Sequence, residues 1–225
     1  MELLEGFDLD QLVKRFGPQP AARAVRILRH ACDSLREAHL HSMVHRDIKP
    51  SNIFLCRLGA NFDFCKLLDF GLVKHCLPDN ASHLTATGAT TGTPAFMAPE
   101  LAATNAAGPE TDIYGLGCVA YWLVTGRLVF EEPTPAATMI AHMQKEPVPP
   151  SAVSEMPIPA ELDRIILACL AKNPGDRPPG VAELDRMLAA CPCEPAWTDA
   201  DAESWWQTNA PEKAAQPDTQ CATQS

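Results

Sequence analysis

His45-Arg46-Asp47-Ile48-Lys49-Pro50-Ser51-Asn52 is the stretch of this sequence that decides the fold. Four titratable side chains stand within its first five residues. Neither the helical nor the strand period of apolar residues runs through it. We therefore expect a loop here that carries chemistry, placed between regular elements.

Regular elements are predicted on both sides of this loop. Before it, apolar residues recur at helical spacing over residues 8–16 and 20–41, so two amphipathic helices are expected. After it, short apolar runs at 53–56 and 64–68 flank a turn at 58–63. This arrangement predicts a small β-hairpin.

The rest of the chain is predicted to be one long loop followed by helices. Residues 69–100 are rich in Gly, Thr and Pro, and loops of this length in a compact domain usually serve function. The helix expected from Thr111 to Thr125 is apolar nearly all round, as a buried central helix would be. Further helices are expected at 134–146, 160–172 and 180–190. The fold class is thus mainly α (α+β).

Composition excludes several classes of function. The chain has 225 residues, 46% of them apolar, which suffices for the core of one domain. Its net charge of −10 argues against a nucleic-acid partner, because no basic excess could replace counterions. We see no signal peptide and no apolar stretch long enough for a membrane segment. The nine cysteines form no CxxC pair, so we expect reduced thiols, no metal role and a cytoplasmic location.

Three motifs occur in a fixed order along the chain. The loop at 45–52 matches the catalytic loop of protein kinases, Asp69-Phe70-Gly71 follows the hairpin, and Ala98-Pro99-Glu100 closes the long loop. Each motif alone is weak evidence, but the ordered set is specific. The chain resembles Hanks-type serine/threonine protein kinases of the bacterial kind, from residue 1 to about 190. The resemblance implies a kinase C-terminal lobe with a small hairpin and a long activation segment.

The resemblance implies transfer of the γ-phosphoryl group of ATP to Ser or Thr hydroxyls of a protein substrate. Asp47 would accept the proton of the hydroxyl, and Lys49 would neutralise charge on the moving phosphoryl group. Asn52 and Asp69 would hold Mg²⁺, with Mn²⁺ as the alternative ion. Catalysis of this kind is mostly positioning and charge neutralisation.

The resemblance also implies the residues that contact the nucleotide. They are Leu4, Asp8, Lys49, Ser51, Asn52, Phe54 and Asp69, with Leu68 beside Phe54 under the adenine.

Residues 1–7 would be the remnant of the hinge between the lobes, and 8–191 the catalytic lobe. Residues 192–225 would form an acidic tail rich in Pro and Ala, largely disordered. One or two helical turns at 198–206 would dock Trp205 or Trp206.

Other residues match scaffold and regulatory positions of the family. Glu100 and Arg177 would form a buried ion pair, and Asp112 would accept hydrogen bonds from the backbone of the catalytic loop. His45 and Phe70 would stack in the internal spine. Thr93, within Gly92-Thr93-Pro94, would favour Ser/Thr acceptors. Arg46 implies control by phosphorylation of the activation loop; the candidate sites are Thr85, Thr87, Thr90 and Thr91.

One departure from the family leaves alternatives open. No glycine-rich loop and no strand with a phosphate-pairing Lys precedes the hinge. We therefore expect a chain that is part of a longer kinase, weakly active or inactive alone, with an exposed cleft that favours self-association. The alternative is an inactive kinase-like binding module. A small-molecule phosphotransferase would share the His-x-Asp loop, but it would predict neither Lys49 nor the Ala-Pro-Glu motif.

Overall fold

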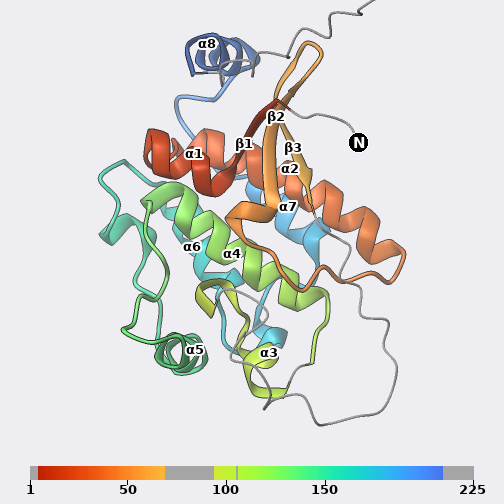
Figure 1. Ribbon diagram of the computed structural model, residues 1–225, viewed down its shortest axis with the longest axis vertical. Coiled ribbons are helices and arrows are strands. Elements are labelled where there is room, and N and C mark those ends of the chain that lie inside the picture. Colours follow the sequence, from red (N-terminus) through yellow and green to blue (C-terminus); the bar gives the residue numbers. More distant parts are fainter. Residues whose placement is uncertain (1–4, 69–93, 105, 210–225) are drawn as a thin grey trace, which may run out of the picture.

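The computed structural model describes residues 5–68, 94–104 and 106–209, and its architecture is a helical lobe that carries one small sheet (Figure 1). The strands are β1 (Gly6–Asp8), β2 (Ile53–Leu58) and β3 (Asn61–Leu67). The helices are α1 (Leu9–Phe16), α2 (Ala21–Leu40), α3 (Pro99–Thr104), α4 (Pro109–Thr125), α5 (Pro135–Gln144), α6 (Ala160–Cys169), α7 (Val181–Ala189) and α8 (Asp199–Asn209). Short 3-10 turns lie at Pro50–Asn52, Pro94–Phe96, Pro150–Ala152 and Pro174–Asp176.

Helix α4 forms the centre of the core. Its apolar side chains point in all directions, and nearly all of its residues are buried, as the sequence predicts. Pro109 occupies the first turn, where a missing N–H costs nothing, and Gly126 ends the helix in the left-handed conformation at φ 66°. Helices α2 and α6 pack against α4, and α7 packs against both of them, so the catalytic loop that follows α2 rests on the packed helices (Figure 1).

Two glycines let neighbouring elements approach α4 closely. A Cβ atom at Gly115 would lie 2.7 Å from Cβ of Ile48, and one at Gly117 would lie 2.7 Å from Cβ of Cys169. Real carbon atoms do not approach this closely, so any side chain here would push away the catalytic loop or α6. The Gly-x-Gly pair thus lies inside a helix and serves packing.

The sheet is antiparallel in the order β1-β2-β3, and its first strand was not predicted. Residues 1–7 are interpreted as a hinge remnant, and no strand is predicted there, whereas Gly6–Asp8 pair with Phe54–Cys56 of β2. Three residues are too few to show an alternating pattern. Gly6 fits because a Cβ atom there would lie 2.1 Å from the carbonyl oxygen of Leu55. The hairpin strands are also longer than predicted, and Gly59, at φ 62°, stands in the turn between them.

Most helices are confirmed, and two differ from the prediction. Helices α1, α2, α4, α5, α6 and α7 appear where the apolar period places them, with ends shifted by up to three residues. Helix α3 was missed, because it forms within the stretch interpreted as loop. Helix α8 runs over eleven residues, longer than the one or two turns expected. No helix in the described ranges combines the length and the hydropathy that a bilayer crossing requires.

A buried histidine joins α5 to the core. His142 is fully buried, and its Nδ1 lies 2.7 Å from the hydroxyl oxygen of Tyr114. The nearby Lys172 donates a hydrogen bond to the His142 carbonyl oxygen. Burial, and secondarily the charge of Lys172, lowers the pKa of His142 from 6.5 to about 4. The neutral imidazole is therefore the form that fits the folded state.

This lowered pKa predicts a pH dependence of stability. The unfolded chain binds a proton at His142 below about pH 6.5, whereas the folded protein resists it until about pH 4. The contribution is present above pH 6.5 and is lost on acidification, by about 3 kcal/mol in total. We expect His142→Gln to flatten the loss of unfolding free energy between pH 6.5 and 4, measured by urea titration. The exposed His41→Gln serves as control, and equal slopes in all three proteins would contradict the prediction.

Candidate active site

One buried carboxylate on α4 binds the backbone of the catalytic loop. Asp112 is 1% exposed and accepts hydrogen bonds from the backbone N–H of His45 at 2.9 Å and of Arg46 at 2.8 Å. This confirms the contact that the sequence predicts for Asp112. Nε2 of His39 also lies 2.8 Å from Oδ2 of Asp112, a third partner that no sequence pattern predicted. The loop is therefore anchored to the centre of the core.

The loop is also tied to the end of the hairpin. Nε2 of His45 lies 2.9 Å from the carbonyl oxygen of Leu68, and the Leu68 N–H donates to the carbonyl oxygen of Asn52 at 2.8 Å. Arg46 has φ 67°, a conformation that costs energy for a residue with a side chain and that often occurs at functional sites. Leu68 directly precedes Asp69 in the chain, so these bonds join the catalytic loop to the last described residue before the Asp-Phe-Gly motif.

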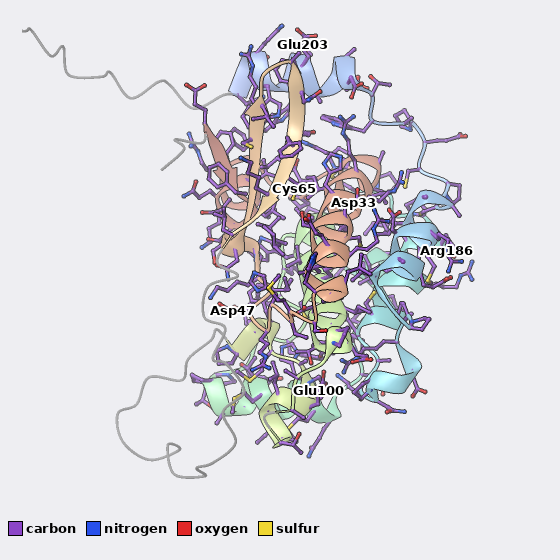
Figure 2. All side chains as sticks on the ribbon, turned by 90° about the vertical axis from the view of Figure 1, so that its right-hand side faces the viewer. Asp33, Asp47, Cys65, Glu100, Arg186 and Glu203 are labelled. Atoms are coloured by element: carbon purple, nitrogen blue, oxygen red, sulfur yellow. The ribbon has the colours of Figure 1, made fainter. Side chains whose placement is uncertain are left out.

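Three of the predicted site residues converge in space. Nζ of Lys49 lies 2.7 Å from Oδ2 of Asp47. Nδ2 of Asn52 donates to the same oxygen at 3.0 Å and to the Asp47 carbonyl oxygen at 2.8 Å. Figure 2 shows Asp47 near the lower end of the hairpin, and its side chain is 47% exposed. The carboxylate is thus fixed on one oxygen and open to solvent.

Two oxygen atoms of this cluster stay available for ligands. Among the described residues, no hydrogen bond reaches Oδ1 of Asp47 or Oδ1 of Asn52. Because both bonds of the Asn52 amide nitrogen go to Asp47, the orientation of the amide is set, and its oxygen is left as a free acceptor. A hard carbonyl oxygen beside a carboxylate suits a hard cation such as Mg²⁺. The donor set present here fits such an ion.

Several predicted site residues lie outside the described ranges. They are Leu4, Asp69, Phe70, Gly71, Thr85, Thr87, Thr90, Thr91, Gly92 and Thr93. The pairing of Asn52 with Asp69 around a metal, and the contacts of the activation loop, therefore stay predictions. Within the described residues, no group of three or more His, Cys, Asp or Glu side chains is arranged to hold a metal.

The predicted nucleotide wall is formed by neighbouring strands. Asp8 of β1 is paired with Phe54 of β2, and paired residues in an antiparallel sheet project from the same face. Phe54 is half-buried, whereas its neighbours Ile53 and Leu55 point into the core and are fully buried. Asp8 also caps α1 by accepting from the N–H of Gln11 at 2.7 Å. Ser51 is exposed in the 3-10 turn, so its proposed contact with the nucleotide stays a prediction.

The ion pair predicted between Glu100 and Arg177 is confirmed. Nη1 and Nη2 of Arg177 each lie 2.8 Å from one oxygen of Glu100, and the Arg177 side chain is completely buried. The hydroxyl of Thr111 donates to Glu100 at 2.9 Å. Burial alone would raise the pKa of Glu100, but the bonds from Arg177 and Thr111 lower it below its usual 4.5. Helix α3, and with it the end of the long loop, is thus fixed to the lobe.

Comparison with known proteins agrees with this geometry. The family model described as protein kinase domain matches residues 1–187. Serine/threonine-protein kinase Pkn1 of Myxococcus xanthus is 42% identical over 188 residues, which are 84% of this chain and 26% of that protein. Serine/threonine-protein kinase PknB of Mycolicibacterium smegmatis is 36% identical over 184 residues, 82% of this chain and 28% of that protein. The chain thus spans 26–28% of the length of these curated relatives.

A solved structure shares the fold. The crystal structure of Rad53 1–466 in complex with AMP-PNP aligns with a TM-score of 0.67 at 23% identity. The alignment covers 83% of this chain and 45% of that one. The expected fold class, a helical kinase lobe with a small sheet, is confirmed. Since the family model covers well over half of the residues, the chain belongs to the protein kinase family.

Proposed function

We propose that this chain supplies the catalytic lobe of a serine/threonine protein kinase, which transfers the γ-phosphoryl group of ATP to Ser or Thr hydroxyls of a protein. The observation that carries the proposal is that the side chains of Lys49 and Asn52 both bind the solvent-exposed carboxylate of Asp47. The relatives named serine/threonine kinases support the class of acceptor.

The proposed chemistry assigns one task to each side chain. Oδ1 of Asp47 accepts no hydrogen bond from the described residues. It takes the proton of the substrate hydroxyl while the oxygen of that hydroxyl attacks the γ-phosphorus of ATP. The bond from that phosphorus to the bridging oxygen breaks, and ADP leaves. Lys49, 2.7 Å from Asp47, lies close enough to offset the negative charge of the phosphoryl group in transfer.

Metal and nucleotide are assigned to the same cluster and to the strand beside it. Asn52, through Oδ1, and Asp69 would hold Mg²⁺ or Mn²⁺, which neutralises phosphate charge when bound. Asp8 and Phe54 share a face of the sheet, which supports contacts with ribose and adenine. Leu4 and Ser51 complete the proposed nucleotide contacts.

Three further proposals concern regulation, assembly and location. Control through Arg46 and a threonine of the activation loop is proposed from the family pattern, and self-association from the exposed cleft. The seven cysteines in the described part of the chain form no disulfide bond, and five of them are buried, which supports a reducing compartment such as the cytoplasm.

An inactive binding module is the second candidate function. The chain corresponds to about a quarter of its relatives' length, so a binding role for the chain alone deserves a direct test. Isothermal titration with ATP and Mg²⁺ measures binding, and transfer of labelled phosphate to a mixture of Ser- and Thr-containing peptides measures activity. We expect magnesium-dependent nucleotide binding. Absence of binding, with the chain folded by circular dichroism, would favour the module.

A further inference from the structure

The segment 197–209 lies beyond the residues that the kinase domain model matches, yet it is packed tightly on the lobe. It contains α8, which lies beside β1 and the hairpin in Figure 1. Ala202 is fully buried and Trp206 is 2% exposed. The segment also holds three of the four tryptophans of the chain. Trp206 is buried and Trp197 and Trp205 are partly buried, so all three tryptophans of the segment pack on the lobe.

The floor of that surface is a buried carboxylate. Asp63 of β3 is fully buried and accepts four hydrogen bonds, two on each oxygen. Nε and Nη2 of Arg23 donate at 3.0 and 2.7 Å, and the indole N–H groups of Trp197 and Trp206 donate at 2.8 and 2.7 Å. Two of the four donors therefore come from the segment, and the carboxylate is completely paired only when the segment is docked.

The walls of the surface are aromatic. The Arg23 guanidinium carbon lies 3.8 Å from the centre of the Trp205 ring, close enough for a cation–π contact. The Trp205 ring packs edge-on against Phe16 with centroids 5.0 Å apart. Both Trp205 and Trp206 also contact Phe7, with centroids 6.0 and 5.8 Å apart. We call Phe7, Phe16, Arg23 and Asp63 the socket.

The socket connects the segment to the strand that borders the candidate nucleotide site. Phe7 is the middle residue of β1, directly before Asp8. Successive side chains of a strand point to opposite faces, so Phe7 faces the segment and the core while Asp8 shares the other face with Phe54. Only three residues of β1 pair with β2, and the contacts of Trp205 and Trp206 with Phe7 add a further hold on this strand.

The segment is anchored separately from the helices that precede it. The connection after α7, residues 190–196, contains no buried residue. Glu203, on the outer surface of α8, lies at the top of the molecule in Figure 2, well away from Asp47, so α8 lies apart from the catalytic loop. If the segment left the socket, Asp63 and Arg23 would stay paired with each other and become solvated.

We propose that residues 197–209 form a C-terminal latch, which docks in the socket, holds β1 against the hairpin and thereby sets the wall formed by Asp8 and Phe54. The link to nucleotide binding rests on the proposed function, whereas the docking of the segment and its hold on β1 are independent of that function. The latch is a positioning device, because no residue in it reaches the cluster around Asp47.

Hydrogen exchange of the full chain tests the hold on β1 without any nucleotide. Trp206→Ala removes one donor to Asp63 and one contact to Phe7. Exchange of the amides in residues 5–10 and 53–58 is expected to accelerate at least roughly tenfold, with α4 and α6 unchanged. Glu203→Ala, an exposed position on the same helix, is the matched control and should exchange like the wild type. Unchanged exchange at β1, or equal acceleration everywhere, would overturn the proposal.

Rescue in trans separates a docking event from a simple loss of stability. A synthetic peptide of residues 197–209, added in excess to the Trp206→Ala chain, should displace the altered segment and restore slow exchange at β1. The same peptide with Trp206→Ala should have no effect. Binding of the peptide to the Trp206→Ala chain is monitored by the tryptophan fluorescence of the peptide. If the intact peptide neither binds nor restores slow exchange at β1, the segment is a fixed part of the hydrophobic core and the latch is refuted.

Nucleotide affinity tests the second half of the proposal. The Kd for Mg–ATP is expected to rise at least roughly fivefold in Trp206→Ala, and to stay at the wild-type value in Glu203→Ala. An unchanged Kd together with faster exchange at β1 would refute the link to the cleft. If the wild-type chain binds no nucleotide, the proposed function fails for this chain, while the exchange and rescue results still decide whether the latch exists.

Discussion

Replacing Asp47 with Asn is expected to lower the rate of phosphoryl transfer by roughly 10²- to 10⁴-fold, the usual effect of losing a general base. The amide cannot take the proton of the substrate hydroxyl near neutral pH. Its carbonyl oxygen can still accept the bond from Lys49, so the local geometry is kept. The measurement is transfer of labelled phosphate to a Ser/Thr peptide, in this chain or in a longer protein that contains it.

The same variant should leave nucleotide binding nearly intact. Asp47 acts on the acceptor hydroxyl, whereas the proposed contacts with metal and nucleotide come from Asn52, Asp69 and the wall beside β1. We therefore expect a fall in kcat with a Kd for Mg–ATP within a few-fold of the wild type. Asp33→Asn makes the same chemical change on the exposed side of α2 and should not alter the rate (Figure 2). Equal rates for the two variants would contradict the role given to Asp47.

The sequence predicted the catalytic loop and its support because both carry strong local signals. Four titratable residues interrupt two apolar periods, and the apolar surface of α4 runs all round the helix. These patterns depend on neighbours in the sequence. The convergence of Asp47, Lys49 and Asn52 follows from a separation of only five residues in one loop. The contact of Asp112 with the loop came from the family resemblance and not from periodicity.

The contacts that the sequence did not predict join distant residues. Asp63 was assigned to the turn of the hairpin, whereas the structure places it in β3, fully buried, with φ 54°. A charged residue is normally exposed, and only its partners explain its burial. Those partners, Arg23, Trp197 and Trp206, lie 40, 134 and 143 residues away. No pattern within a window of the sequence reports such a network.

The largest loss of stability is expected at Arg177, whose guanidinium satisfies several elements at once. Besides the two bonds to Glu100, it donates to the carbonyl oxygens of Ala171, Glu110 and Lys172 at 2.9, 2.8 and 3.3 Å. Its side chain has no exposed surface, and that of Glu100 is 16% exposed. The pKa of Glu100 is lowered, so this contribution is fully present above about pH 4.5 and is lost as the pH falls through the lowered value.

Arg177→Ala is expected to reduce the free energy of unfolding by about 3–5 kcal/mol, because it removes the charged partner of Glu100 and the bonds that Arg177 donates to three carbonyl groups. Urea titration at pH 7 measures the change. Arg186→Ala is the matched control: its ion pair with Glu183 is mostly exposed, at 73% for Arg186, and such pairs contribute about 0–1 kcal/mol. Glu100→Gln should fall between the two, since the amide keeps the bond from Thr111 and still accepts one bond from Arg177. Equal effects of Arg177→Ala and Arg186→Ala would show that the buried pair does not fix the end of the activation segment to the lobe.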